Sequence, residues 1–245
     1  MNPIVLIPAR MAASRLPGKP LAEIEGAPMI VRVLRCAQAA AIGPVAVAAG
    51  DPEIAEAVIR AGGRAVLTDP DLPSGSDRIL AALAELDPEG RHDAVINLQG
   101  DMPFVAPSIL TACAGLLAGE PACDIATVVA PEASPADRTN PDVVKAIVSL
   151  AEGASAGRAL YFTRSTLYGE GPVLRHIGIY GYRRAALEAF NAAPPSPLER
   201  RERLEQLRAL ELGLSIHAAV AEAAPISVDT PADLEAARAF AREHP

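Results

Sequence analysis

The sequence predicts an α/β protein with a mostly parallel sheet flanked by helices, and three observations lead to this prediction. Short apolar runs typical of buried strands alternate with longer segments in which apolar residues recur at helical spacing. Of the 245 residues, 50% are hydrophobic, which is enough for one large core. Beyond about residue 130 the alternation loosens, and the strand-like runs carry more polar residues. This change predicts a smaller lobe with a mixed sheet.

The chain opens with an apolar strand, residues 3–8, that leads into a loop containing three cations. Arg10 and Arg15 can form paired hydrogen bonds with phosphate oxygens, and Lys19 adds a compact point charge. Several loop residues are small enough for backbone N–H groups to approach a ligand closely: Ala9, Ala12, Ala13, Ser14 and Gly18. The stretch therefore predicts a phosphate-binding loop, although it matches neither common glycine-rich phosphate motif. The plainer alternative is a solvated loop with scattered arginines.

Charge and cysteine content limit the classes of partner. The net charge of −8 argues against a nucleic acid or an anionic membrane surface, so local cations must hold any anionic substrate. The three cysteines form no C-x-x-C pair, and their odd number suits a reducing cytoplasm. The opening apolar run is too short for a signal peptide, and no uninterrupted apolar span follows. We expect a cytoplasmic protein.

The elements of the first half follow from apolar periodicity and from the positions of proline and glycine. A proline in the first turn begins a helix over 28–35, and the apolar run over 94–98 predicts the central strand. The other helices are expected over 53–61, 79–86 and 107–117, and the other strands over 45–48, 64–67 and 125–129. Binding loops should lie at the carboxyl ends of these strands.

A polar turn, Ser74 to Arg78, enters the helix over 79–86. Ser76 or Asp77 would serve as its N-cap, which explains part of the pattern. Gly75 and Arg78 exceed what a cap needs, so this turn is also a candidate binding segment.

A second turn, Gln99-Gly100-Asp101, follows the central strand. A carboxylate at the end of a buried strand is well placed to hold Mg²⁺ against phosphate oxygens. The alternative is an ordinary aspartate in a turn.

The second half contains strands expected over 140–148, 160–165 and 176–182. The spacing of His176 and Tyr180 puts both side chains on one face of the last of these strands. Taken alone, a single histidine is more often structural than functional.

Two helices are expected near the end of the chain. The first, over 197–212, has a leucine stripe, and Glu205 and Gln206 lie off this stripe, where they could simply be solvated. The terminal helix begins at Thr230, with Pro231 in its first turn and Asp233 three residues after Thr230. Asp229 is left over from this pattern and is a candidate for either a structural or a chemical role.

Residues Arg10 to Leu21, together with the later turns, resemble the sugar-acid cytidylyltransferases, most closely the 3-deoxy-manno-octulosonate (Kdo) cytidylyltransferase family. The likeness spans nearly the whole chain. It implies a Rossmann-like fold of the nucleotide-diphospho-sugar transferase type and a homodimer. The implied parts are a nucleotide-binding part over about 1–130, a sugar-binding and dimerisation lobe over about 131–225, and a terminal helix, 226–245, returning to the first part.

The resemblance implies transfer of CMP from CTP to the sugar acid's anomeric hydroxyl, with Mg²⁺ as cofactor, for lipopolysaccharide biosynthesis. The implied catalytic residues are Arg15, Lys19, Asp101 and Asp229, of which Asp101 and Asp229 hold the metal. The implied nucleotide-binding residues are Ala9, Arg10, Ser14, Arg15, Lys19, Ser74, Gly75, Arg78 and Gln99. The implied sugar-binding residues are Gln99, Arg164, His176, Tyr180, Glu205 and Gln206.

The chain departs from the family pattern at three places. Met102 stands where relatives carry a glutamate, and Ala49-Gly50 stands where they carry T-D. The segment between Ser165 and Arg175 is shorter than in many relatives and lacks their Trp. These departures leave the edge of the pocket open.

Three alternatives remain open. The sugar acid could be 8-amino-Kdo or sialic acid, which would change only the sugar pocket. Gly153 to Gly157 spells the G-x-S-x-G of serine hydrolases, with Asp229 and His244 following in hydrolase order, but His244 is next to the chain's end. A non-catalytic nucleotide sensor would keep Arg15 and Lys19 and would need neither metal carboxylate.

Overall fold

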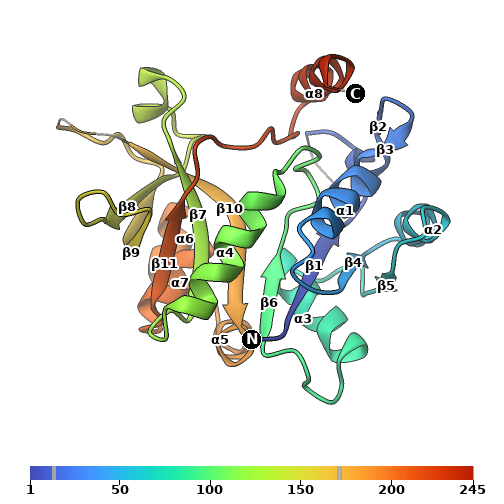
Figure 1. Ribbon diagram of the computed structural model, residues 1–245, viewed down its shortest axis with the longest axis horizontal. Coiled ribbons are helices and arrows are strands. Elements are labelled where there is room, and N and C mark those ends of the chain that lie inside the picture. The colour runs from blue at the N-terminus through green and yellow to red at the C-terminus, as the bar shows by residue number, and fades with distance from the viewer. Residues whose placement is uncertain (13–14, 170, 172, 245) are drawn as a thin grey trace. The chain divides into compact units, whose positions relative to one another are not determined.

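The computed structural model describes residues 1–12, 15–169, 171 and 173–244, and the chain divides into two compact units (Figure 1). The first unit comprises Met1–Leu110 and Pro225–Pro245, and the second comprises Thr111–Ala224. The boundary between the two units, after Leu110, therefore lies earlier in the chain than the expected boundary near residue 130. The reason is that strand β7 (Ile125–Pro131) pairs with strands of the second unit.

Parallel strands form the sheet of the first unit, in the order β5-β4-β1-β6. Their bounds are β1 (Pro3–Ala9), β4 (Val45–Ala49), β5 (Ala65–Leu67) and β6 (Ala94–Asn97). Strand β1 is buried along almost its whole length, because its apolar side chains pack within the unit's core. The parallel pairing confirms the α/β prediction for this part of the chain.

The helices of the first unit connect these strands. Helix α1 (Met29–Ala39) begins directly after Pro28, as expected, and helix α2 (Pro52–Arg60) begins at Pro52, one residue before the expected start. Helix α3 (Gly75–Leu86) begins before the expected residue 79. Its N-cap is Ser74, whose side chain accepts a hydrogen bond from the backbone N–H of Asp77 at 3.1 Å. The expectation that Ser76 or Asp77 caps this helix is therefore wrong.

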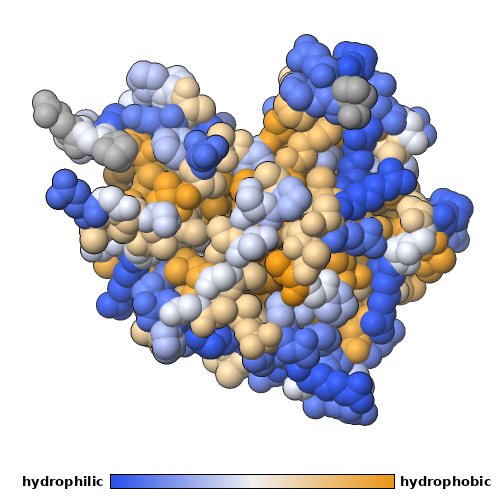
Figure 2. Space-filling view, viewed as in Figure 1, coloured by the Kyte–Doolittle hydropathy of each residue, from blue (hydrophilic) through white to orange (hydrophobic). Residues whose placement is uncertain are grey.

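The terminal helix α8 (Pro231–Glu243) also belongs to the first unit. A capping box joins Thr230 and Asp233 at its start, as the sequence predicted. Its buried side packs against the short hairpin of β2 (Glu23–Ile24) and β3 (Ala27–Pro28). The outward side of α8 is hydrophilic, as the upper right of Figure 2 shows.

A mixed sheet forms the second unit, in the order β10-β7-β11-β9-β8, with β8 also pairing with β10. Strand β11 runs parallel to β7, whereas β10 is antiparallel to β7 and β9 is antiparallel to both β11 and β8. Their bounds are β8 (Lys145–Ser149), β9 (Ala156–Thr163), β10 (Leu174–Arg183) and β11 (Ile216–Val220). The predicted mixed-sheet lobe is confirmed.

The second unit differs from the sequence prediction in several elements. The strand expected over 140–148 is only β8, because the carbonyls of Asn140 and Pro141 accept side-chain hydrogen bonds instead of ladder bonds. A short 3-10 turn, Pro135–Arg138, precedes it. Two elements were not expected at all: strand β11, and helix α5 (Arg184–Ala192), which follows β10 without any breaker residue.

The helix expected over 197–212 is broken into α6 (Pro197–Glu202) and α7 (Gln206–Glu211). The break lies at Arg203, whose φ of +56° is in the left-handed region. Helix α4 (Pro107–Gly119) begins in the first unit and ends in the second. In the part of the chain that the structure describes, no helix is both long enough and apolar enough to cross a membrane.

Candidate active site

A cavity of about 250 Å³ lies in the first unit at the carboxyl ends of β1 and β6. Its lining residues are Pro8, Ala9, Arg10, Ala12, Lys19, Pro20, Ser74, Gly75, Arg78, Gln99, Gly100 and Asp101. This volume is near the lower end of the range of about 300–1,000 Å³ for small-molecule sites. Apart from Arg15, every described member of the predicted nucleotide-binding set lines it. Ser14 lies outside the described residues.

Lys19 lies between two carboxylates that are far apart in the sequence. Its Nζ donates to Oδ2 of Asp101 at 2.9 Å and to Oδ1 of Asp229 at 3.0 Å. Asp229 reaches this position because the backbone N–H of Val228 donates to the carbonyl of Asp101 at 2.9 Å. The structure thus brings Lys19, Asp101 and Asp229, all predicted to be catalytic, into direct contact.

Gly18 allows the backbone to present Lys19 in this way. Its φ of +71° is in the left-handed region, which glycine adopts without steric cost. The 3-10 turn Lys19–Leu21 follows directly, and the N–H of Lys19 donates to the carbonyl of Leu16 at 3.1 Å. The lysine is therefore held by a turn at the end of the loop.

Burial and charge act in opposite directions on this cluster. The side chain of Lys19 is 15% exposed, and desolvation alone would lower its pKa. The charges and hydrogen bonds of Asp101 and Asp229 outweigh this effect, so the pKa of Lys19 is raised. Desolvation raises the pKa of Asp101, and the charge of Lys19 opposes it. Lys19 is therefore a cation at neutral pH.

Arg15 joins the cluster through Asp229 and does not line the cavity. Its Nη2 lies 3.2 Å from Oδ2 of Asp229, and the two side chains are 62% and 41% exposed. Arg10 is exposed beside the same loop. The two arginines are thus available to an anion from solvent.

Arg78 is more deeply buried than the sequence indicated. It is 2% exposed, and its guanidinium donates to Oγ1 of Thr68 at 2.7 Å and to the carbonyls of Asp69 and Pro70 at 2.9 and 3.1 Å. Desolvation, followed by the charge of Arg10, lowers the pKa of Arg78. Arg78 therefore meets the cavity as a fixed group.

Two of the family departures now have a structural explanation. A Cβ on Gly50 would lie 2.8 Å from Nη1 of Arg78, so the glycine makes room for the buried guanidinium. Met102 is 6% exposed and belongs to the core. Asp51 has a role that no local sequence pattern indicated: its Oδ2 accepts a hydrogen bond from the N–H of Met11 at 2.7 Å and holds the loop.

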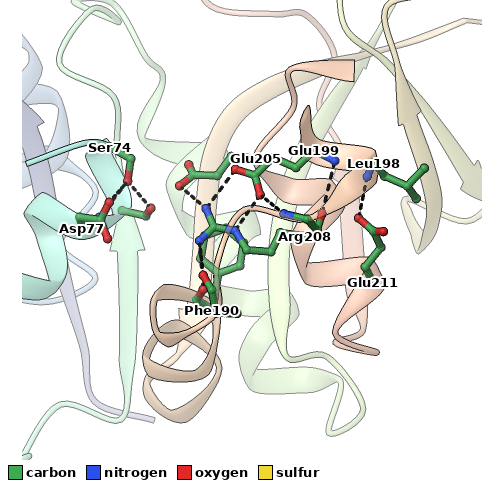
Figure 3. Close-up of polar contacts among 11 residues, drawn as sticks. Ser74, Asp77, Phe190, Leu198, Glu199, Glu205, Arg208 and Glu211 are labelled. Atoms are coloured by element: carbon green, nitrogen blue, oxygen red, sulfur yellow. Dashed lines mark hydrogen bonds and ion pairs between the residues drawn. The ribbon is translucent and has the colours of Figure 1, made fainter. Parts of the chain in front are cut away.

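Ser74 caps helix α3 and also lines the cavity. Figure 3 shows its hydroxyl next to Asp77, to which it donates at 2.7 Å while it also caps α3. Gln99 is oriented by a hydrogen bond from its Nε2 to Oδ1 of Asn97 at 3.2 Å. Both side chains line the cavity as polar groups with a defined direction.

The second unit brings His176 and Tyr180 together on β10. Their ring centroids are 5.3 Å apart, as the spacing predicted, although the pairing of β10 with β7 shifts register between Ile177 and Tyr180. Oγ1 of Thr127 lies 3.0 Å from Nε2 of His176, and Phe162 packs edge-on at 5.0 Å. Desolvation lowers the pKa of His176 to about 3, so the imidazole is neutral.

Glu205 and Gln206 are the other two residues expected to bind the sugar acid. Desolvation raises the pKa of Tyr180, and the negative charge of Glu205 raises it further. Gln206 is 7% exposed, and its Nε2 has no hydrogen-bond partner among the described residues. A buried amide donor without a protein acceptor is a candidate contact for a ligand.

Arg164 is held by backbone carbonyls. Its Nη1 donates to the carbonyl of Pro141 at 3.0 Å and lies 3.5 Å from that of Asp142. Beneath it, the completely buried Lys145 donates to the carbonyls of Asn140 at 2.6 Å and Arg164 at 2.9 Å. Desolvation lowers the pKa of Lys145. Apart from the rarity of lysine in this chain, no local signal marked this residue.

The serine hydrolase alternative is contradicted by the structure. A nucleophile elbow is a turn from a strand into a helix. Here Gly153 lies in a turn, with a φ of +73°, and the segment continues into strand β9. The carbonyl of Ser155 accepts a hydrogen bond from Val220 at 2.8 Å. The motif is therefore a strand entry.

Comparisons with known proteins agree with this geometry. The cytidylyltransferase family model matches residues 4–216. The 3-deoxy-manno-octulosonate cytidylyltransferase of Rhodospirillum centenum is 59% identical over 98% of this chain and 93% of its own length. The protein of the same name from Parvibaculum lavamentivorans is also 59% identical, over 97% of this chain and 92% of its own length.

A solved structure is similar over the whole chain. It is that of CMP:2-keto-3-deoxy-manno-octonic acid synthetase complexed with CTP, with a TM-score of 0.90, 37% identity and full coverage of both chains. A nucleotidyl transferase from Methanothermobacter thermautotroptrophicus, at 17% identity and a TM-score of 0.64, shares the fold. From these matches, the chain belongs to the 3-deoxy-manno-octulosonate cytidylyltransferase family of nucleotidyltransferases.

Proposed function

We propose that this chain transfers CMP from CTP to the anomeric hydroxyl of 3-deoxy-D-manno-octulosonate, giving CMP-Kdo and pyrophosphate. One observation supports this most directly: the Lys19 ammonium and the carboxylates of Asp101 and Asp229 meet beside a cavity that Arg10 and Arg78 also line. A nucleoside triphosphate needs cations around its phosphates and oxygens for its metal ion. The product would be an activated sugar for lipopolysaccharide biosynthesis.

Asp101 and Asp229 fit a Mg²⁺ ion by the chemistry of their donors. One oxygen of each carboxylate already lies within about 3 Å of a single cationic atom, Nζ of Lys19. Hard anionic oxygens of this kind are the ligands that Mg²⁺ prefers. When bound, Mg²⁺ supplies charge neutralisation on the phosphates and on the leaving pyrophosphate. These two carboxylates would hold it, and Lys19 and Arg15 would contact phosphate oxygens.

The other cavity residues would bind and orient the nucleotide. Ala9 and Gly75 leave space for close approach of the ligand, because neither has a large side chain. Ser74 and Gln99 present a hydroxyl and an amide to the nucleotide. Arg78 would act as a preorganised cation, because three hydrogen bonds fix its guanidinium before substrate arrives.

The second unit would supply the sugar-acid contacts. The neutral imidazole of His176 and the hydroxyl of Tyr180 can exchange hydrogen bonds with sugar hydroxyls. The buried Nε2 of Gln206 would gain the acceptor that it lacks among the described residues. Glu205 would accept from a sugar hydroxyl, and Arg164 would pair with the sugar's carboxylate. In chemical terms, the anomeric oxygen attacks the α-phosphorus and pyrophosphate leaves.

The proposal also assigns a role to each unit and to the terminal helix, and a location to the protein. The first unit would be a Rossmann-like nucleotide-binding part, as its parallel strands and connecting helices suggest. The second unit would be the sugar-binding part and would form a homodimer. The terminal helix would complete the nucleotide-binding part. The three free thiols suit a cytoplasmic location.

A substrate matrix tests the proposal. Four nucleoside triphosphates are assayed against Kdo, 8-amino-Kdo and sialic acid, with Mg²⁺, and pyrophosphate release is measured. We expect CTP with Kdo to have the highest kcat/KM. A higher kcat/KM with 8-amino-Kdo or sialic acid would reassign the sugar, and equal use of all four triphosphates would contradict the nucleotide assignment.

A further inference from the structure

We propose that Arg208 is a positioning residue that aims the carboxylate of Glu205 at the sugar acid, an inference that rests on the proposed role of Glu205. Glu205 and Gln206 lie at the corner where helix α6 ends and α7 begins. Arg203 turns the chain there with a φ of +56°. The corner presents an acceptor and a donor next to each other, a pair that suits a polyhydroxy ligand.

Arg208 holds this corner from inside the second unit (Figure 3). It is 7% exposed, and its Nη2 donates to Oε1 of Glu205 at 3.1 Å and to Oε1 of Glu199 at 3.2 Å. Its Nε lies 2.9 Å from the other oxygen of Glu199. Nη1 donates to the carbonyls of Phe190 and Ala193, and the guanidinium lies 4.2 Å from the centre of the Phe190 ring.

These partners make Arg208 a rigid support. Phe190 and Ala193 are at the end of helix α5, and Glu199 forms the capping box of α6 with Ser196. Glu205 is thereby connected through one guanidinium to two helices that are fixed independently of it. A glutamate on the surface loses rotamer freedom when a ligand orders it, and the contact with Arg208 orders Glu205 before substrate binds.

Charge balance favours positioning over simple neutralisation. A buried guanidinium needs one carboxylate to offset its charge, and Glu199 contacts it through both oxygens. Glu205 is therefore a second carboxylate on Arg208, beyond the one needed to offset its charge. The side chain of Glu205 stays 36% exposed, and its charge acts on Tyr180 and Tyr182 of β10. Glu205 is therefore held by Arg208 through Oε1 while its side chain still reaches solvent.

The direct test is Arg208→Lys, because lysine keeps the charge and loses the planar fork that reaches both carboxylates. We expect the KM for Kdo to rise about tenfold, the loss of roughly one charged hydrogen bond, with the KM for CTP within twofold of the wild type. A matched control is Glu202→Gln, at the end of the preceding helix α6. Glu202 accepts hydrogen bonds from Tyr161 and Thr163 and does not contact Arg208.

A purely structural role of Arg208 predicts that Arg208→Lys lowers the unfolding midpoint and leaves the KM for Kdo unchanged, as in the control. A positioning role predicts the KM change in Arg208→Lys alone. If Arg208→Lys does not fold, Glu205→Asp tests the same contact from the exposed side, because the shorter carboxylate cannot keep both its Arg208 contact and its reach. The same selective rise in the KM for Kdo is expected there.

A double-mutant cycle separates this inference from the proposed function. In a Glu205→Gln background, Arg208→Lys should raise the KM for Kdo by less than twofold, because its effect passes through Glu205. If the two substitutions instead raise the KM for Kdo by independent factors that multiply, the positioning role of Arg208 is refuted, while the proposed function is not affected. If Glu205→Gln leaves the KM for Kdo unchanged, Glu205 does not bind the sugar and the inference fails, whereas the substrate matrix still decides the overall reaction.

Discussion

Replacing Asp229 by asparagine separates a metal ligand from a helix-entry residue. Asp229 makes ion pairs with Lys19 at 3.0 Å and with Arg15 at 3.2 Å, and its side chain is 41% exposed. Exposed ion pairs contribute about 0–1 kcal/mol each, and Lys19 keeps its bond to Asp101. The start of α8 is unaffected, because Asp233 accepts the hydrogen bonds from the N–H groups of Asp229 and Thr230.

The expected loss of stability is therefore about 2 kcal/mol or less, which corresponds to a Tm change of at most roughly 4–8 °C. The expected loss of activity is much larger. Asparagine keeps the shape and one acceptor oxygen but removes the negative charge that Mg²⁺ selects. The charge stabilisation that a metal supplies is several kcal/mol, so kcat/KM should fall at least about a hundredfold. Pyrophosphate release and thermal unfolding measure the two effects on the same sample.

CTP binding without Mg²⁺ should remain measurable in Asp229→Asn, because the cationic side of the cavity is intact. Asp101→Asn should show the same loss of activity. Because both carboxylates would serve one ion, the double variant should cost little more than either single variant. The reasoning is refuted if Asp229→Asn keeps activity and loses only thermal stability, since Asp229 would then be a structural residue.

Four further outcomes are expected. Lys19→Ala should lower kcat by at least about tenfold in the pyrophosphate assay, because a cation beside the triphosphate acts on the transition state, and an unchanged kcat would contradict this. Lowering the pH from 7 to 5 should cost about 2 kcal/mol of folding stability through His176, because only the unfolded state gains its proton there, and urea unfolding of His176→Gln should show a correspondingly weaker pH dependence. Thr230→Ala should lower the free energy of unfolding by about 1 kcal/mol through loss of the helix cap, and an unchanged urea midpoint would argue against the capping box. Ser155→Ala should leave CMP transfer intact, whereas loss of an esterase activity in that variant would restore the hydrolase alternative.

The sequence by itself determined the features that depend on local patterns. The alternation of apolar runs with segments of helical periodicity was sufficient to predict the parallel strands of the first unit and the mixed sheet of the second. Each helix or strand must bury apolar side chains against the core, and this requirement sets the spacing of its apolar residues. The cations of the opening loop and the turn at Asp101 could be recognised because each is contiguous. The capping box at Thr230 is likewise a pattern of four residues.

Only the tertiary structure decided which of these groups meet. Asp229 reaches Lys19 through a backbone hydrogen bond between Val228 and Asp101, a pairing that no local pattern encodes. The leucine periodicity over 197–212 predicted one helix, but a left-handed residue, Arg203, breaks it, because packing and the buried Arg208 outweigh the modest cost of that conformation. Helical propensity contributes only a small free energy for each residue, so it is easily outweighed. A buried charge, by contrast, requires specific partners, and these partners come together only when distant segments of the chain fold.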